Sequence, residues 1–347
     1  MATLASEYAT LIDLTKRLNP NGSVETEISE MLTQSNPLLD DLMFKEGNEI
    51  TGHQVTIRTG LPESYFRKIN QGVAASKSTT VQVKEATAML EAHSKIDGKL
   101  AQLNGNTAAW RLSEQKPFIE SLNQKLNYAL LYGDHTVNPE QFMGLAPRFD
   151  TISGAVNGDN ILDAGGTGSD NTSIWLVGHG QEGVFGIYPK GSQGGLKHIN
   201  EKDGSGDGMM PLTDADGLTF RGYSDRYQWD CGLVVKDWRT VVRIANIDIS
   251  DLLALATTQA TTAATNIIDL MSRSIDRLPD GLGIKPVFYA NRTIFSMLRV
   301  MARRMASSAL GIVDGFDQFG KSRKELQFDG FSVRKMDQLL STETRIT

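Results

Sequence analysis

The chain has 347 residues, of which 40% are hydrophobic and 22% charged, and its formal net charge is −6. This length allows two or three domains, and the composition supports a real core in a soluble protein. The negative charge argues against a surface built mainly to bind nucleic acid, although it permits a local basic patch. No run approaches about 18 apolar residues, so we predict no membrane span.

Cys231 is the only cysteine. A single cysteine excludes an intramolecular disulfide and a cysteine-cluster metal site, and it suits a reducing cytoplasm. The first residues lack the hydrophobic block of a signal peptide. These features together predict a protein that folds in a cytoplasm.

Short helical pieces are predicted for residues 1–46, where Leu4, Tyr8 and Leu11 mark one apolar face. Pieces this short, with few apolar residues, do not make a core of their own. We therefore expect this segment to lie on another surface.

Residues 53–60 and 78–85 both alternate between apolar and polar side chains, which predicts an antiparallel hairpin. The connection between them is about seventeen residues long and carries Arg67, Lys68 and Lys77. Loops of this length inside compact domains are usually functional or stabilised by a partner, and two strands alone are not stable in water. We infer a projecting β-arm that leans on another molecule, with a loose surface hairpin as the alternative.

Residues 113–133 predict one long helix, with Ser113 as its N-cap and Gly133 as a left-handed stop. Its apolar stripe repeats every four residues and is widened by two more: Phe118, Leu122, Leu126 and Leu130, with Ile119 and Ala129. The opposite face is polar: Glu120, Gln124 and Lys125.

Strands and loops alternate in the middle of the chain. Residues 150–173 and 189–217 are rich in turn formers and predict loops. Between these loops we expect two short strands, at 174–177 and 184–188. Residues 218–245 predict a long β-hairpin.

The last third of the chain predicts helix, strand, helix and strand. Ser250 begins the first helix, residues 284–290 form a strand, Asn291 caps the second helix, and residues 326–334 return as a strand. Three arginines of the second helix lie away from its apolar face: Arg292, Arg299 and Arg303. The elements together predict a mixed α+β fold.

Two motif matches point to chemistry but lack the right context. Residues 315–322 match the phosphate-loop pattern G-x-x-x-x-G-K-S, yet no strand is predicted before them and no full helix after them. Residues 203–214 match a calcium loop only loosely, because the last position is Asp214 instead of Glu. No histidine pair has helical ligand spacing, and nothing assembles a catalytic constellation. We predict no catalytic residue, cofactor site or metal site.

A set of short segments, in this order and spacing, resembles one family. They are Tyr188–Ser192 with Gly195–Leu196, Trp229–Val235, Trp238–Arg239, Arg243–Asp248, Tyr289–Arg292 and Phe328–Arg334. The chain resembles the tailed-phage major capsid proteins of the Hong Kong 97-type fold, in particular the short-tailed phage group typified by epsilon-15. The resemblance covers nearly the whole chain.

This resemblance implies names for the parts of the chain. They are an N-terminal arm (1–46), an extended loop (47–98), a peripheral domain (99–245) with a spine helix at 113–132 and long strands, an axial domain (246–335) and a C-terminal tail (336–347). The segments 150–173 and 197–217 are possible insertions.

The implied function is a virion capsid subunit that assembles as hexamers and pentamers into an icosahedral shell around double-stranded DNA, formed in the cytoplasm of a bacterial host. Scaffold, portal and decoration proteins are the further partners implied, with no membrane. The expected intersubunit contacts are Arg67, Lys68, Lys77, Leu4, Tyr8 and Leu11. Two alternatives remain: a nucleotide-dependent cytoplasmic enzyme that uses the 315–322 match, and another phage structural component.

Overall fold

The computed structural model describes residues 32–103, 107–204, 207–214, 216–252, 262–304, 310–316 and 322–347. The chain divides into two compact units. The first comprises Met1–Gln34, Met89–Leu126 and Gly195–Asp230, and the second comprises Ser35–Ala88, Asn127–Gly194 and Cys231–Thr347. Helices and strands mix in the described residues, as the α+β prediction requires.

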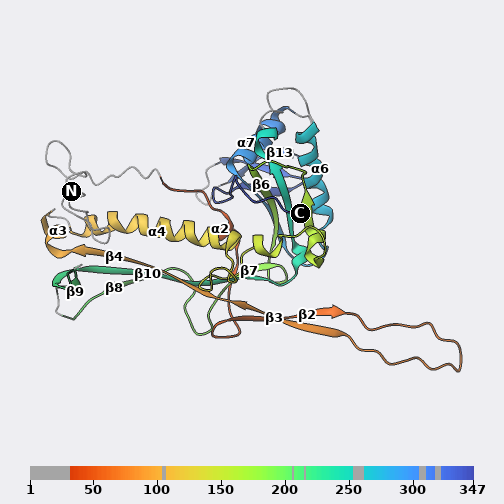
Figure 1. Ribbon diagram of the computed structural model, residues 1–347, viewed down its shortest axis with the longest axis horizontal. Helices are drawn as coiled ribbons and strands as arrows, with labels where there is room; N and C mark the ends of the chain where they lie inside the picture. The colour runs from red at the N-terminus through yellow and green to blue at the C-terminus, as the bar shows by residue number, and fades with distance from the viewer. Residues whose placement is uncertain are drawn as a thin grey trace. The chain divides into compact units, whose positions relative to one another are not determined.

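The first unit is built on a long helix and a long strand. Helix α4 (Thr107–Tyr132) belongs to it up to Leu126, and strand β10 (Thr219–Val235) up to Asp230. Three further strands pair with β10: β4 (Ala88–Asp97), β8 (Lys197–Glu201) and β9 (Met210–Thr213). Helix α3 (Gly98–Leu103) follows β4. Figure 1 shows α4 running alongside β4 and β10.

The second unit contains a mixed sheet in the order β13-β14-β15-β12-β6-β7. Its strands are β6 (Asn171–His179), β7 (Val184–Tyr188), β12 (Lys285–Ala290), β13 (Leu310–Phe316), β14 (Ser322–Phe328) and β15 (Phe331–Lys335). Strand β11 (Val241–Asp248) pairs antiparallel with β6 and parallel with β5 (Ile161–Asp163). Strand β1 (Phe44–Glu46), which follows the short helix α2 (Leu38–Asp41), pairs in parallel with β7.

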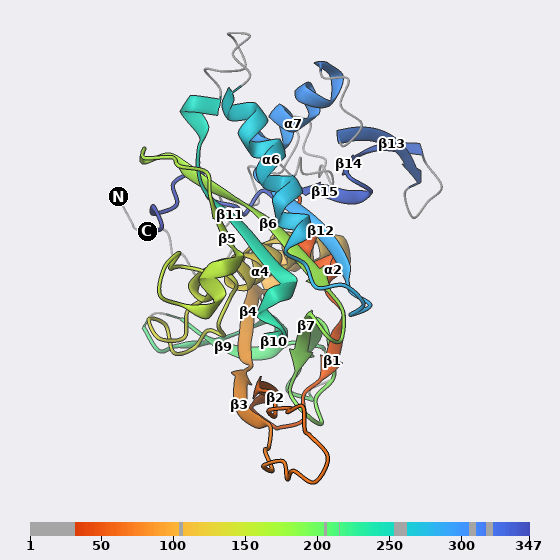
Figure 2. The same cartoon turned by 90° about the vertical axis from the view of Figure 1, so that its right-hand side faces the viewer.

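Two helices cover this sheet and close the main core. Helix α6 (Thr262–Asp276) contributes Ile267 and Met271, and helix α7 (Arg292–Arg304) contributes Ile294 and Leu298. Figure 2 shows α6 crossing the strands of the sheet. The predicted cap of α7 is confirmed, because Oδ1 of Asn291 accepts a hydrogen bond of 3.0 Å from the backbone N–H of Thr293.

The predicted hairpin of the arm is confirmed as β2 (Gly52–Gly60) and β3 (Thr79–Ala86). Val55 lies opposite Val83, and Ile57 lies opposite Val81. In Figure 1 the connecting loop extends beyond the ends of these two strands.

Helix α4 ends at Tyr132 as predicted, but it begins earlier than predicted. It begins at Thr107, so Ser113 is an interior residue and not the N-cap, and Pro117 lies inside the helix. The sequence TAAWRL ahead of Ser113 contains good helix formers, which explains the earlier start. Ile119 is 43% exposed and so lies outside the buried stripe.

Gly133 ends α4 for a different reason from the one predicted. Its φ is not positive, so it is not a left-handed stop. A Cβ at this position would lie 2.5 Å from the carbonyl oxygen of Ala129 and 2.7 Å from that of Phe142. Glycine is needed here because the backbone of a following segment comes close, and Gly144 donates a 2.7 Å hydrogen bond to the Gly133 carbonyl.

The predicted hairpin at 218–245 is wrong. Strands β10 and β11 occupy this range, but β10 pairs with β7, β8 and β9 whereas β11 pairs with β5 and β6. The short 3-10 turn Trp238–Thr240 between them, capped by Asp237, leads the chain to a different partner strand. Alternation identifies strands but does not choose their partners.

The two predicted loops contain strands. Strand β5 and the start of β6 lie within 150–173, and β8 and β9 lie within 189–217. The strands β5, β8 and β9 have only three to five residues each, so their hydrophobic pattern is too short to show a period.

The single strand predicted at 326–334 is a hairpin of β14 and β15. Its turn is Asp329-Gly330, and both residues have positive φ, 49° and 85°. An Asp-Gly pair with two positive φ angles is typical of a tight type I′ hairpin turn.

The phosphate-loop match at 315–322 lies in another hairpin. Phe316, near the end of β13, pairs with Ser322 at the start of β14. A phosphate loop instead joins a strand to a helix whose N-terminus faces the phosphates. Lys321 lies outside the described residues.

We predict that Leu122→Ala combined with Leu126→Ala prevents the subunit from folding. Both side chains are buried, at 3% and 2% exposure, and each substitution is expected to cost about 2–5 kcal/mol of a typical total of about 5–15 kcal/mol. The control is Gln124→Ala with Lys125→Ala on the polar face, which should fold. Comparing soluble yield tests this, and a soluble, shell-forming leucine variant would contradict it.

Candidate functional site

The loop of the arm, residues 61–77, is exposed throughout. It carries five large apolar side chains in water: Leu61, Tyr65, Phe66, Ile69 and Val73. Phe66 is 108% and Ile69 92% exposed, the values of side chains that touch almost nothing. Contiguous apolar exposure of this kind marks a surface made for a partner.

The cationic residues predicted for intersubunit contact lie on the same loop. Arg67 and Lys68 directly follow Phe66, and Lys77 lies near the end of the loop. A turn at Lys68–Gln71, with Asn70 at φ 67°, presents the first two at the tip. Leu4, Tyr8 and Leu11 lie outside the described residues.

The cations of this loop were predicted as contact residues from the sequence, whereas its apolar residues were not. Leu61, Tyr65, Ile69 and Val73 recur every four residues, which is the spacing of one helix face, but the structure forms no helix in this segment. The available signal was their presence in a long loop without a core.

The base of the arm is fixed to the second unit. Val55 is buried with Phe185, Ile187 and Val234. Near the end of β3, the buried Glu85 accepts hydrogen bonds from Arg148 on both of its carboxylate oxygens, each at 2.6 Å. A bidentate guanidinium–carboxylate pair has a defined orientation, so it holds the start of the arm while the loop stays exposed.

The segment that leads into the arm is also tied down within the second unit. Ser35 and Asp337 exchange two hydrogen bonds, from Ser35 N–H to the carboxylate at 3.0 Å and from Asp337 N–H to the Ser35 carbonyl at 3.1 Å. Asp41 pairs with Arg334 at 3.0 Å and accepts a 2.6 Å hydrogen bond from the hydroxyl of Tyr289. Residues 35–41 therefore have fixed positions on the strands β12 and β15.

Residues just before this segment contact α4 within the first unit. Gln124 donates to the Leu32 carbonyl at 2.8 Å, and the carboxylate of Glu120 accepts from the Gln34 N–H at 3.0 Å. The polar face of the helix thus binds the chain where it leaves the predicted N-terminal arm.

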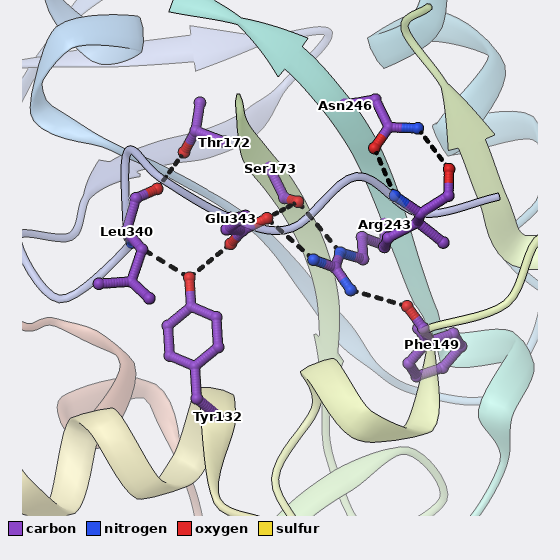
Figure 3. A network of polar contacts seen from close by, with 9 residues as sticks. Tyr132, Phe149, Thr172, Ser173, Arg243, Asn246, Leu340 and Glu343 are labelled. Carbon is purple, nitrogen blue, oxygen red and sulfur yellow. Dashed lines mark hydrogen bonds and ion pairs between the residues drawn. The ribbon is translucent and has the colours of Figure 1, made fainter. Parts of the chain in front are cut away.

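A buried polar network joins the C-terminal segment to the sheet (Figure 3). Arg243 on β11 pairs with Glu343 at 2.8 Å, and both side chains are 5% exposed. Arg243 also donates to the Phe149 carbonyl at 2.7 Å and to the Ser173 hydroxyl at 3.0 Å. Tyr132, at the end of α4, donates to the other oxygen of Glu343.

The electrostatics of this network follow from burial. Burial first, and the Glu343 carboxylate second, raise the pKa of Tyr132, so its phenol remains a hydrogen-bond donor. Asn246 binds the backbone of Ile346 with two further hydrogen bonds of 2.8 and 2.9 Å. The last residues of the chain are therefore part of the fold.

We predict that Glu343→Gln destabilises the subunit by about 3–5 kcal/mol, because it leaves the buried Arg243 without its counter-charge. Urea unfolding of the soluble subunit measures this. The control is Arg345→Gln, since Arg345 is exposed two residues away. Equal stability of the two variants would show that the pair contributes little.

A second buried network centres on His179. Its Nε2 lies 2.8 Å from the hydroxyl of Tyr289, which in turn binds Asp41. Burial lowers the pKa of His179 to about 4, and burial followed by the Asp41 charge raises the pKa of Tyr289. The imidazole is therefore neutral at physiological pH.

This pKa predicts acid sensitivity. The folded-state pKa lies below the ordinary value of 6.5, so the unfolded chain binds a proton first as the pH falls. The contribution of the neutral His179 to the free energy of unfolding is full above pH of about 6.5 and is lost as the pH falls toward about 4. Roughly 2 kcal/mol of it is lost between pH 7 and 5. Urea unfolding at these two pH values should show a smaller loss for His179→Gln. An unchanged loss would contradict this assignment.

The described residues offer no metal centre: no group of three or more His, Cys, Asp or Glu could hold an ion. In the loosely matched calcium loop, Asp203 and Asp207 instead bind the guanidinium of Arg221 at 2.7 and 2.9 Å. Among these residues, no helix is long and apolar enough to cross a membrane.

The fold of the chain is similar to that of a solved structure. The chain is similar to a protein chain in a near-atomic structure of bacteriophage Epsilon15, with 33% identity, a TM-score of 0.73 and 100% coverage of both chains. It is more weakly similar to a GTA particle capsid, with 9% identity, a TM-score of 0.47 and coverage of 64% of this chain and 94% of that one. It is also similar to the procapsid of bacteriophage JBD30, with 11% identity, a TM-score of 0.43 and coverage of 78% of this chain and 84% of that one. No curated protein matches its sequence. The chain has the Hong Kong 97-type fold of tailed-phage capsid proteins.

The family follows from the sequence as well. Residues 19–347 match the family model described as Major capsid protein GP7. The chain belongs to this family and is a phage major capsid protein, the building block of an icosahedral shell. The predicted resemblance and fold class are confirmed.

Proposed function

We propose that the subunit assembles as hexamers and pentamers, and that its arm loop covers a neighbouring subunit in the shell. The observation that carries this proposal is the apolar loop, in which Phe66 and Ile69 are almost fully exposed in the single chain. A neighbouring copy buries such side chains, and burial of each contributes roughly 1.5–3 kcal/mol.

In this proposal the cations of the loop act beside the apolar residues. Arg67 and Lys68 beside the apolar tip, and Lys77 at the end of the loop, pair with acidic groups of the neighbour as a polar rim. Leu4, Tyr8 and Leu11 supply apolar contacts from the N-terminal arm. A chain with six more acidic than basic residues, 41 against 35, offers such acidic groups.

The parts of the chain take the corresponding roles. Residues 1–46 act as the N-terminal arm, 47–98 as the extended loop, 99–245 as the peripheral domain, 246–335 as the axial domain around the capsomer centres and 336–347 as a tail. The buried tie between Arg243 and Glu343 supports a tail that stays with its own subunit.

The shell encloses double-stranded DNA and forms in the cytoplasm of the bacterial host, with scaffold, portal and decoration proteins as further partners. The subunit acts as a structural protein and not as an enzyme. Supporting this, the one nucleotide-binding pattern of the sequence has a β-strand on each side.

The test is a charge placed on the apolar tip. We predict that Phe66→Asp with Ile69→Asp leaves a soluble, folded subunit that no longer forms shells, because a buried unpaired carboxylate opposes the contact. Circular dichroism reports folding, and sedimentation with negative-stain microscopy reports assembly.

The matched control is Gln71→Asp with Ala75→Asp, which adds the same two charges at exposed positions of the same loop that carry no large apolar side chain. This control should still assemble. Normal shells from the Phe66/Ile69 variant would refute the role of the loop.

A further inference from the structure

Helix α7 presents a row of arginines on its exposed side. Its buried side carries Ile294, Met297, Leu298 and Met301. Arg292, Arg299 and Arg303 are exposed, together with Ser296. At 3.6 residues per turn these four positions fall within a sector of about 60° and extend over about 16 Å of helix.

These arginines differ from most others in the described chain. Arg111, Arg148, Arg221, Arg226, Arg239, Arg243 and Arg334 each form an ion pair with a carboxylate. Within the described residues, Arg292, Arg299 and Arg303 form none, and α7 itself contains no acidic residue. The row is thus a local positive surface on a chain whose net charge is −6.

We propose that this row binds the phosphate backbone of double-stranded DNA, which rests on the proposed function of a shell that encloses DNA. Guanidinium groups match phosphate oxygens in a bidentate manner, and a serine hydroxyl between them donates to the same acceptors. A duplex carries one charge per about 1.7 Å of its axis with both strands counted, so a stretch of about 16 Å carries roughly ten charges around its circumference.

The composition of the row favours DNA over a neighbouring protein. Protein interfaces centre on aromatic or apolar residues with charges at the rim. Among the described side chains of α7, Val300, at 37% exposure, is the large apolar one that is exposed. Sequence-independent binding of a packed duplex needs only cations in a row, which is what this face offers.

The experiment measures binding of a short mixed-sequence DNA duplex to purified capsomers at several salt concentrations. Each phosphate contact contributes about −0.9 to the slope of log K against log salt. Arg299→Gln with Arg303→Gln should therefore reduce the magnitude of the slope by about 1.8, and Arg299→Lys with Arg303→Lys should keep it.

The control is Arg273→Gln with Arg345→Gln, which removes two exposed charges elsewhere and should leave the slope unchanged. An equal change in this control, or no change in the α7 variant, overturns the proposal. A folded α7 variant that keeps its DNA slope but loses assembly identifies an acidic neighbour as the partner instead. Failure of the unmodified chain to form shells would refute the proposed function. The salt dependence of DNA binding is measured on capsomers, so its result does not depend on shell formation.

Discussion

The buried pair of Arg243 and Glu343 is the interaction on which the second unit depends most. It lies where β11, β6, the end of α4 and the C-terminal segment meet, and five residues share its hydrogen bonds: Tyr132, Phe149, Ser173, Arg243 and Glu343. Both charges are nearly inaccessible to water. Because an unpaired charge is very unfavourable at such a place, the C-terminal segment must be docked for Arg243 to be buried with its counter-charge.

A shell subunit has to be stable before its neighbours arrive, and yet it has to keep surfaces unsatisfied for them. The second unit separates these requirements. Its stability comes from the core between the sheet and helices α6 and α7, and from buried pairs such as Glu85 with Arg148. Its unsatisfied surface is concentrated in residues 61–77, where the backbone pairs with no strand and the apolar side chains lie in water.

The sequence predicted local structure well and pairing poorly. The hairpin of the arm, the α7 cap at Asn291 and the buried leucines of α4 follow from short-range patterns. The partner of β10 does not, because alternation specifies which face is buried but not which strand lies beside it. Gly133 shows the same limit: its role depends on Phe142 and Gly144 approaching from a later segment. Of the candidate site, the arm was predictable. Its exposed apolar residues were not, because the four-residue spacing from Leu61 to Val73 is typical of a helix and the structure forms none there.

The distribution of arginine follows from the same separation of roles. A guanidinium is always charged, so a fold that buries one must supply a carboxylate, as Glu343 does for Arg243 and Asp225 does for Arg111. Arg292, Arg299 and Arg303 of α7 have no such carboxylate among the described residues, and they remain in solvent on a helix whose other face is core. Folding does not require these charges, since lysine, glutamine or serine would serve equally well on a solvated helix face. Their regular row is therefore better explained by what the assembled shell contains than by the stability of the subunit.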